Sequence, residues 1–270
     1  MTNGSAAGGT VVLVTGPQRS GTTLVRRVLE AHEDLAVVPT DSWLLPRTDT
    51  VARAAGVDVG ADRFAPDDLL RVVPAAPSEG PLSKWGLGPE AVLAEVGAPT
   101  WDGVFVGMVR AFQRANDGRT VVMKSPRSAA YVRTAVGALE REGHSARLVV
   151  CVRHPVATYR SWANRSGAGG WSDGERGRDP RLWAGRWLRE VGTGLELLAA
   201  PPCPATLVRY EDLIAGPAAV ADSLCDLVGV PSRSGPMAAA LDRPPNSSFT
   251  GQARGERGAA ARGARRAAPS

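Results

Sequence analysis

The chain has 270 residues, of which 43% are hydrophobic and 22% are charged, and its formal net charge is +5. A chain of this length and composition can bury a full hydrophobic core, which excludes a small fold held together by disulfides. No apolar run reaches membrane-spanning length, so we expect neither a membrane-spanning helix nor a membrane partner.

The cysteines and the opening residues bear on the cellular compartment. The three cysteines are an odd number and lie far apart in the sequence. This spacing argues against a disulfide framework and indicates a reducing compartment. The opening stretch "MTNGSAAGG" has no basic segment followed by an apolar core, so we expect no signal peptide. The sequence therefore predicts a cytoplasmic protein with a flexible segment over residues 1–9.

Positive charge is concentrated towards the C-terminal end. From residue 253 onward there are five arginines and one glutamate, a balance of +4, which leaves about +1 of the net charge for residues 1–252. This nearly neutral body argues against a nucleic-acid partner. The terminal stretch lacks hydrophobic periodicity, so we predict a disordered tail over residues 253–270, with an anion-binding tail as the alternative.

Short apolar runs rich in β-branched residues alternate with helical patterns along the chain. One amphipathic helix is expected directly after the first run, a second around Trp183–Leu198 and a third around Val220–Val228. The alternation predicts an α/β fold in a single domain of residues 10–252, with a mainly parallel sheet flanked by helices on both faces. The predicted strands span residues 10–15, 35–39, 120–124, 147–152 and 205–210.

Two segments interrupt this alternation. Residues 44–118 begin with a stretch rich in proline and acidic residues and show only short helical patterns, such as "PEAVLAEV". Residues 164–181 contain five glycines and many charges. Long segments of this kind are usually functional or disordered. We therefore interpret both as substrate-side insertions or lids, with variable surface insertions as the alternative.

The stretch "GPQRSGTTL" follows the first predicted strand and opens the first predicted helix. Its two glycines allow tight backbone geometry, and the N–H groups from Ser20 onward lie at a helix start, where an anion is favoured. Thr22 stands where a nucleotide-binding P-loop has lysine, and Arg19 supplies a planar cation inside the loop. The alternative is a glycine-rich turn without a ligand. The predicted oxyanion site consists of Arg19, Ser20, Gly21, Thr22 and Thr23.

The same stretch resembles the 5′-phosphosulfate loop of the sulfotransferases that use 3′-phosphoadenylyl sulfate (PAPS). The resemblance is to the arginine form of this loop, which occurs in tyrosylprotein sulfotransferases and many bacterial members. It implies a P-loop-type three-layer sandwich and PAPS as the sulfuryl donor. It also implies adenosine 3′,5′-bisphosphate (PAP) as a product, and no obligatory Mg²⁺ or other metal.

Three further segments resemble motifs of this family and follow in its order. "VRHPVATYRSW" resembles the 3′-phosphate motif, which implies that Arg153 and Ser161 hold that phosphate. "RYEDL" implies a nucleotide contact by Tyr210, and "VVMKSPRS" implies that Lys124 lies near the transferring sulfate. The alternatives are a strand-end salt bridge for Arg153 and an ordinary exposed lysine for Lys124. The later Arg-Lys-Gly cluster of many members has only "ARGERG" in its place, and we assign no role to it.

The resemblance also bears on the catalytic base. Sulfuryl transfer needs cations around the moving group, here Arg19 and Lys124, and a base for the acceptor hydroxyl. Arginine-loop members use a carboxylate downstream of the loop, and Asp41 in "VVPTDSW" lies at nearly the same offset. We predict Asp41 as the base, and the alternative is that it caps a short helix starting at Ser42. The weaker candidates are the three histidines, His32, His144 and His154.

Four of the seven tryptophans can be assigned either to the core or to an acceptor pocket. Trp183 and Trp187 are four positions apart in a predicted helix, and residues in such an arrangement are more often part of the core than a substrate platform. Trp43 is close to Asp41, and Trp171 lies in the glycine-rich segment. We regard these last two as the better candidates for an acceptor pocket.

Taken together, these residues predict a PAPS-dependent O-sulfotransferase that acts on a hydroxyl group of a small molecule, a sugar or glycan, or a peptide. Two alternatives stay open. A Mg-dependent P-loop kinase or NTPase is disfavoured by the missing lysine and by the Arg153–Ser161 pair. A nucleotide-binding module without catalysis would be favoured if replacing Arg19, Asp41 and Lys124 left the biological activity unchanged.

Overall fold

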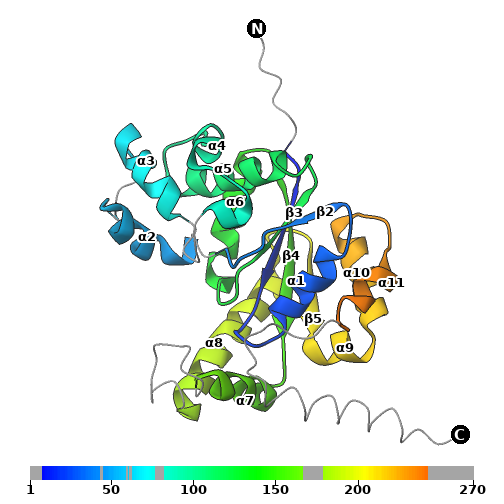
Figure 1. Ribbon diagram of the computed structural model, residues 1–270. Helices are drawn as coiled ribbons and strands as arrows, with labels where there is room; N and C mark the ends of the chain where they lie inside the picture. Colours follow the sequence, from blue (N-terminus) through cyan, green and yellow to red (C-terminus); the bar gives the residue numbers. More distant parts are fainter. Residues whose placement is uncertain are drawn as a thin grey trace, which may run out of the picture.

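The computed structural model describes residues 8–42, 45–58, 60, 63–76, 82–166 and 179–242. Within these residues the chain forms a five-stranded, fully parallel sheet in the order β2-β3-β1-β4-β5 (Figure 1). The strands are β1 (Thr10–Thr15), β2 (Leu35–Val37), β3 (Thr120–Lys124), β4 (Ser145–Val152) and β5 (Ala205–Arg209). The prediction of an α/β fold with a mainly parallel sheet is therefore confirmed.

Helices connect the strands and cover the sheet. The α-helices are α1 (Thr22–Glu30), α2 (Thr48–Ala55), α3 (Pro66–Ala75), α4 (Pro89–Leu93), α5 (Trp101–Arg114), α6 (Val132–Arg141), α7 (Pro155–Ser166), α8 (Pro180–Ala199), α9 (Tyr210–Ala215), α10 (Pro217–Val228) and α11 (Ser234–Ala239). Short 3-10 turns are η1 (Leu45–Arg47), η2 (Leu82–Trp85) and η3 (Ala129–Tyr131).

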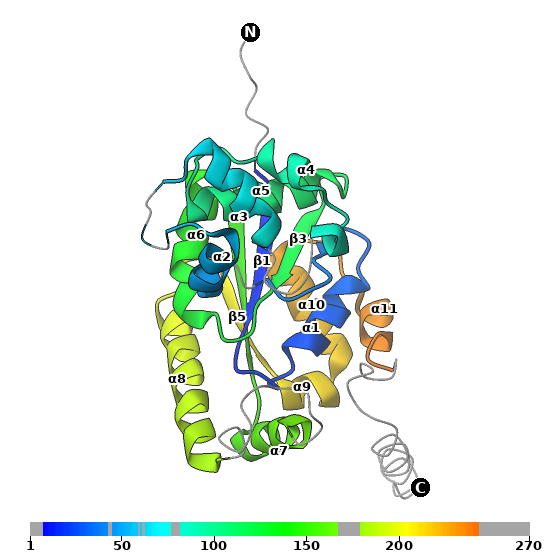
Figure 2. The same cartoon turned by 60° about the vertical axis from the view of Figure 1, so that its left-hand side comes forward.

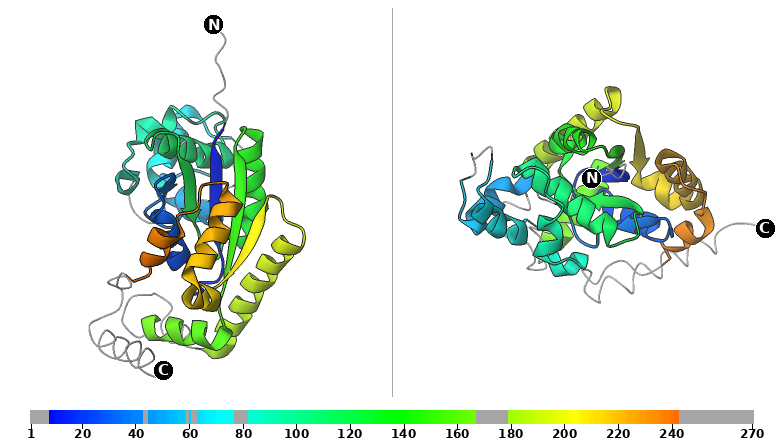
Figure 3. Two further views of the ribbon diagram at one scale, coloured as in Figure 1. Left: turned by 90° about the vertical axis from the view of Figure 1, so that its right-hand side faces the viewer. Right: turned by 90° about the horizontal axis from the view of Figure 1, so that it is seen from above.

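The central strand β1 explains why the sheet is covered on both faces. Its sequence is apolar without alternation, so side chains on both sides need burial. Val11 and Leu13 pack into one hydrophobic cluster together with residues of α5 and α6. Val12 and Val14 pack into a second cluster with residues of α1, α10 and α11. Figures 2 and 3 show these two groups of helices on opposite sides of the sheet.

The segment 44–118 contributes to the core as well as to the surface. Val72 of α3 and Trp85 of η2 are buried in the first cluster, and α5 supplies a continuous run of buried residues to it. In this segment α5 packs on β3 of the sheet, and α2, α3 and α4 pack in turn on one another and on α5. Our assignment of substrate-side insertions or lids, and the domain boundaries, stay predictions.

The structure corrects or leaves aside several expectations. Trp183 and Trp187 stack on each other with ring centroids 6.3 Å apart and are only half-buried. They belong to neither core cluster of the described residues, so their assignment to the core was wrong. Trp43, Trp171 and the tail 253–270 lie outside the described residues.

Two further findings concern the compartment and the membrane. The three cysteines are buried free thiols. No described helix combines the length and apolar character needed to cross a bilayer. The cytoplasmic location stays a prediction.

Candidate active site

The backbone conformation of the loop between β1 and α1 restricts which residue types can occupy it. Gly16 has φ 144° and Gly21 has φ 101°, a region that favours glycine. A Cβ on Gly16 would lie 2.2 Å from the carbonyl oxygen of Cys151, so no side chain fits there. Arg19 also has a positive φ, of 70°, which is a strained conformation for arginine. The loop therefore holds a strained cationic residue between two obligatory glycines.

Hydroxyl groups line the start of α1 beside this loop. Ser20 and Thr22 are buried, and Ser20 Oγ has no hydrogen-bond partner within the described part of the chain. The first N–H groups of a helix have no intrahelical acceptor and carry the positive end of the helix dipole. The N-cap residue of α1, Gly21, has no side chain that could accept a hydrogen bond from these N–H groups. An oxyanion at this helix start would meet several donors.

Arg19 joins the loop to the middle of α7. Its Nε donates a hydrogen bond to Ser161 Oγ at 3.1 Å, although the two residues are 142 positions apart in sequence. Arg153, at the end of β4, places Nη1 3.5 Å from the carbonyl oxygen of Arg19. The Nε atom of Arg153 is buried without a hydrogen-bond partner among the described residues. The two segments predicted to bind phosphates thus lie side by side.

Tyr210, the first residue of α9, packs against both phosphate segments. Its ring lies under the guanidinium of Arg153, with the Arg153 Cζ 3.8 Å from the ring centroid. A Cβ built on Gly21 would lie 2.9 Å from Tyr210 Cδ2, so the ring also covers the N-cap of α1. This arrangement gives a cation–π contact and leaves no room for a larger residue at position 21.

Glu211 fastens α9 to the same corner. Its Oε1 accepts a hydrogen bond from the backbone N–H of His154 at 2.9 Å. Burial alone would raise the pKa of Glu211, but this hydrogen bond and the charges of Arg209 and Arg153 hold it below its usual range. The carboxylate thereby ties the start of α9, and with it Tyr210, to the end of β4.

Lys124 and Asp41 form an ion pair at the carboxyl end of β3. Lys124 Nζ contacts Asp41 Oδ1 and lies 3.4 Å from Thr23 Oγ1 on α1. The side chain of Lys124 is 8% exposed and that of Asp41 is 18% exposed. A partly buried ion pair has strong mutual interactions because water screens it poorly. An ammonium and a carboxylate therefore lie together beside the loop of residues 16–21 between β1 and α1, which we call the oxyanion loop.

The segment that carries Asp41 is held from three sides. Arg26 Nη1 of α1 donates to the carbonyl oxygen of Pro39, and Trp85 Nε1 donates to Thr40 Oγ1 at 2.8 Å. The backbone N–H of Ser42 donates to the carbonyl oxygen of Lys124 at 2.9 Å. The alternative that Asp41 caps a helix starting at Ser42 is wrong, because Ser42 is not helical.

The histidines occupy other places. His32 and His144 are buried near the amino ends of β2 and β4, away from the loop. His32 Nε2 contacts the carbonyl oxygen of Pro231 at 2.8 Å. Burial lowers the pKa of His144, which contacts the carbonyl oxygen of Gly9. His154 is exposed and takes part in the site through its backbone N–H.

The structure thus brings the predicted phosphate-binding residues, Asp41 and Lys124 into one connected group at the carboxyl edge of the sheet. Trp85, Arg26 and Glu211 also belong to this group but were not assigned there from the sequence. Arg26 is three positions after Thr23 on the same helix face, which is a usable signal. Trp85 lies in the segment without recognisable motifs and gave no signal. Among the described residues, no cluster of three or more histidine, cysteine, aspartate or glutamate side chains could hold a metal.

Comparison with known proteins places this geometry in a family. The family model described as "Sulfotransferase family" matches residues 12–234. No curated protein sequence matches the chain. Among solved structures, the sulfotransferase domain of the Synechococcus PCC 7002 olefin synthase is similar with a TM-score of 0.57 and 23% identity. That likeness covers 89% of this chain and 79% of the other.

A second solved structure has a similar fold. The sulfotransferase domain from the curacin biosynthetic pathway has a TM-score of 0.50 and 20% identity, over 90% of this chain and 80% of its own. At sequence identities this low, the structural similarity supports the fold and nothing further. The family model carries the assignment, because its match includes the oxyanion loop, the Lys124 segment, the Arg153–Ser161 segment and Tyr210. The chain belongs to the sulfotransferase family.

Proposed function

We propose that this protein transfers the sulfuryl group of PAPS to an acceptor hydroxyl, giving a sulfate ester and PAP. The observation that carries the proposal is the 3.1 Å contact between Arg19 Nε and Ser161 Oγ, with Arg153 beside it. A ligand with a 5′-phosphosulfate and a 3′-phosphate needs two neighbouring anion sites. A nucleoside triphosphate needs a single continuous one.

The residues present fit such a ligand. Ser20 Oγ and Arg153 Nε are buried polar atoms without hydrogen-bond partners among the described residues, and buried polar groups are normally satisfied. Each lies in one of the two segments that would hold a phosphate group. An oxyanion at each segment would satisfy these atoms. The ring of Tyr210 would then contact the nucleotide between them.

The proposed roles follow from charge and position. When bound, PAPS supplies the sulfuryl group and a phosphate leaving group. Arg19 and Lys124 stabilise the negative charge that develops on the sulfuryl and bridging oxygens. Asp41 accepts the proton of the acceptor hydroxyl. Lys124 holds the Asp41 carboxylate in place until the acceptor arrives, through the ion pair described above.

Ligand-induced thermal stabilisation tests the proposal. PAP at about 100 times its dissociation constant should stabilise the fold by about 2.7 kcal/mol, and 5′-AMP at the same concentration should stabilise it much less. Stabilisation by ATP with Mg²⁺ and none by PAP would instead indicate the kinase or NTPase alternative. Retained PAP binding without any transfer activity would indicate the non-catalytic module.

Arg153→Ala should remove most of the preference for PAP over 5′-AMP. A hydrogen bond to a charged group contributes about 1.5–3 kcal/mol, so the preference should fall roughly 10- to 150-fold. Titration calorimetry with both nucleotides measures it. Arg189→Ala is the matched control, because that arginine is exposed on α8 and belongs to neither phosphate segment. If Arg153→Ala leaves the preference intact, the 3′-phosphate is held elsewhere.

Trp85→Phe should lower kcat about 2- to 10-fold while leaving PAP affinity unchanged. The substitution keeps an aromatic ring against Phe112 but removes the hydrogen bond to Thr40, whose net contribution is about 0.5–1.5 kcal/mol. Thr40→Val should have the same effect, and the double variant should show no further loss. Trp101→Phe, in the same segment, is the control. Additive losses in the double variant would contradict a shared role in placing Asp41.

A further inference from the structure

The longest helix of the described residues, α8, turns an apolar face to solvent. Leu188 is 63% exposed and Leu195 is 50% exposed, whereas Leu197 on the other side of the helix is buried in the first core cluster. Gly194 also lies on the buried side, because a Cβ there would come 2.9 Å from Val150 Cγ1 of β4. Figures 2 and 3 show α8 along the outer edge of the molecule. No described element covers its outward face.

Two glycines lie on this outward face without a reason inside the chain. A Cβ built on Gly185 or on Gly192 would meet no atom of the described residues within 4 Å. Neither glycine has the positive φ that excludes other residues. Glycine in the interior of a helix is less stable than alanine, so its use there calls for a reason. The packing and backbone of a single chain do not supply one.

The outward face repeats with a period of seven residues. It consists of three rows: small residues (Gly185, Gly192, Ala199), leucines (Leu188, Leu195) and charged residues (Arg189, Glu196). Residues seven apart stay on one side of a helix, because the helix drifts by only about 20° per seven residues. Rows of this period, with apolar residues flanked by charges, are typical of a helix that packs lengthwise along another helix.

A two-fold axis beside Gly192 matches these rows with those of a second α8 helix in antiparallel orientation. Under such an axis, residues equally far before and after Gly192 lie opposite each other. Gly185 and Ala199 of the partner subunit are each seven positions from the centre. Leu188 is four positions before it and Leu195 is three after it, so these two meet with an offset of about 1.5 Å. The small residues let the two backbones approach closely.

The charged row selects this orientation. Arg189 is three positions before Gly192 and Glu196 is four after it, so each Arg189 meets Glu196 of the partner subunit. The two-fold symmetry makes this contact twice. In a parallel pair, by contrast, Arg189 would lie beside Arg189 of the partner subunit, and like charges side by side are unfavourable. The face is therefore complementary to itself in the antiparallel arrangement.

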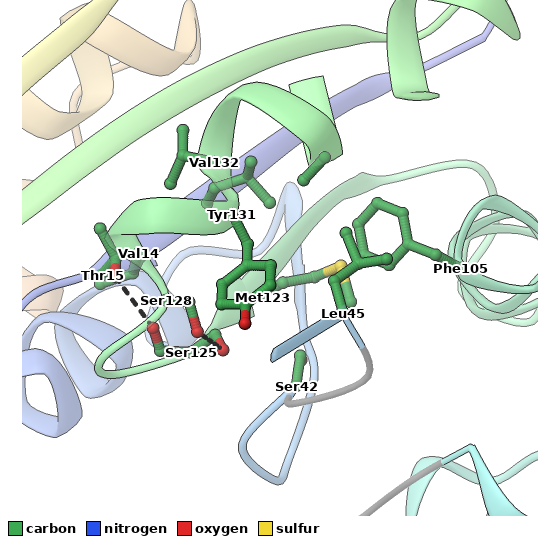
Figure 4. A pocket seen from close by; sticks show the side chains of 12 residues that line it. Val14, Thr15, Ser42, Leu45, Phe105, Met123, Ser125, Ser128, Tyr131 and Val132 are labelled. Atoms are coloured by element: carbon green, nitrogen blue, oxygen red, sulfur yellow. Dashed lines mark hydrogen bonds between the residues drawn. The ribbon is translucent and has the colours of Figure 1, made fainter. Parts of the chain in front are cut away.

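The shape of the face fits a protein surface better than a small molecule. The pocket shown in Figure 4 lies elsewhere, among residues of β1, β3, η1, η3, α5 and α6 and the neighbouring loops, and none of its lining residues belongs to α8. Exposed leucines beside glycines on one helix offer contact area along the helix. Clustered apolar surface of this kind marks an interaction site.

We propose that the outward face of α8 is the interface of a homodimer, in which two copies of this chain pair through antiparallel α8 helices about Gly192. The inference goes beyond the proposed sulfuryl transfer and does not depend on it. Specific, stable interfaces bury about 1,200–2,000 Å². One helix from each chain supplies a limited part of such an area, so the dimer dissociates on dilution.

Sedimentation equilibrium of the full chain at several protein concentrations tests the proposal, and we expect a monomer–dimer equilibrium. Arg189→Glu should raise the dimer dissociation constant at least about tenfold, because two attractive contacts become two repulsive ones. Glu196→Arg should do the same. The double variant Arg189→Glu/Glu196→Arg exchanges the two charges and should restore the dissociation constant of the unaltered chain. Such rescue requires that the two positions meet across the interface.

Gly192→Leu tests the close approach of the helices. The leucine has room within one chain but holds the two helices apart, so the protein should be monomeric at every concentration. Its melting temperature should not fall, because leucine is the better helix former. Leu188→Glu should also give a monomer, since it places a charge in the apolar row. Leu70→Glu is the matched control: this leucine is 58% exposed on α3, and its replacement should leave the dimer unchanged.

The nucleotide site provides a further control. None of these substitutions should alter the preference for PAP over 5′-AMP, because the outward face of α8 belongs to neither phosphate segment. A chain that is monomeric at every concentration overturns the proposal. A dimer that both charge reversals leave intact, or that the double variant does not restore, overturns it as well. In each of these cases the proposed sulfuryl transfer is unaffected.

Discussion

The Asp41→Asn variant is expected to lose about two to four orders of magnitude in kcat for sulfuryl transfer, the usual contribution of a general base. Asparagine has nearly the same shape and keeps an oxygen facing Lys124 Nζ, but it cannot take up the proton of the acceptor. Transfer from PAPS to an alcohol under single-turnover conditions measures the chemical step directly. PAP affinity should change little, because Asp41 contacts Lys124 rather than the phosphate segments.

Asp34→Asn is the matched control for this experiment. Asp34 precedes the same short strand, β2, at its opposite end and is exposed, so its replacement should leave kcat unchanged. Thermal unfolding of both variants in the presence of PAP shows whether the site is still formed. Near-normal turnover of a folded Asp41→Asn protein would exclude Asp41 as the base. Lys124 would then remain as the charged group next to the reacting hydroxyl.

Arg19→Gly is expected to lower kcat about 10²- to 10³-fold without lowering the stability of the unliganded fold. Loss of one donor to a developing oxyanion has this effect on rate in other enzymes. The backbone at position 19 has φ 70°, which costs a residue other than glycine about 1–3 kcal/mol. Glycine relieves that cost, which offsets the lost contact with Ser161.

Asp117→Gly provides the comparison for Arg19→Gly. Asp117 also has a positive φ, of 57°, and is exposed in the turn before β3, at the opposite end of the sheet from the loop. This variant should gain stability in the same way and keep full activity. Calorimetric unfolding and transfer rates for both variants give the two quantities. Unchanged kcat in Arg19→Gly would remove the loop arginine from the chemistry.

The fold could be predicted from the sequence where a short segment is apolar throughout, because such a segment is expected to form a buried strand. The β1 and β3 segments are apolar and β-branched, so their bounds agree with those predicted. The strand predicted over residues 205–210 ends one residue earlier, because Tyr210 begins α9. The 14-residue helix α5 was not predicted. Its buried residues form an almost unbroken run from Gly103 to Phe112, although the charged residues Asp102, Arg110 and Arg114 still give it an amphipathic character.

The site could be predicted where one residue type suits one ligand group within a recognisable motif. Arg19, Arg153 and Lys124 came from such segments, and the structure brings them together. Trp85 could not be found in this way. Its link to Asp41 runs through Thr40. This link depends on how η2 packs against the segment that carries Thr40 and Asp41, which no local sequence pattern encodes.

The strand order has a consequence for how the protein is made. β1 lies at the centre of the sheet, and Val11 pairs with Val121 on one side and with Ala146 on the other. Contacts over more than a hundred residues close slowly, because a long loop must be ordered before they form. During synthesis, the oxyanion loop is complete long before its strand has any neighbour. The growing chain therefore carries an apolar, unpaired β1 until β3 and β4 have emerged, and over this interval it depends on protection from aggregation.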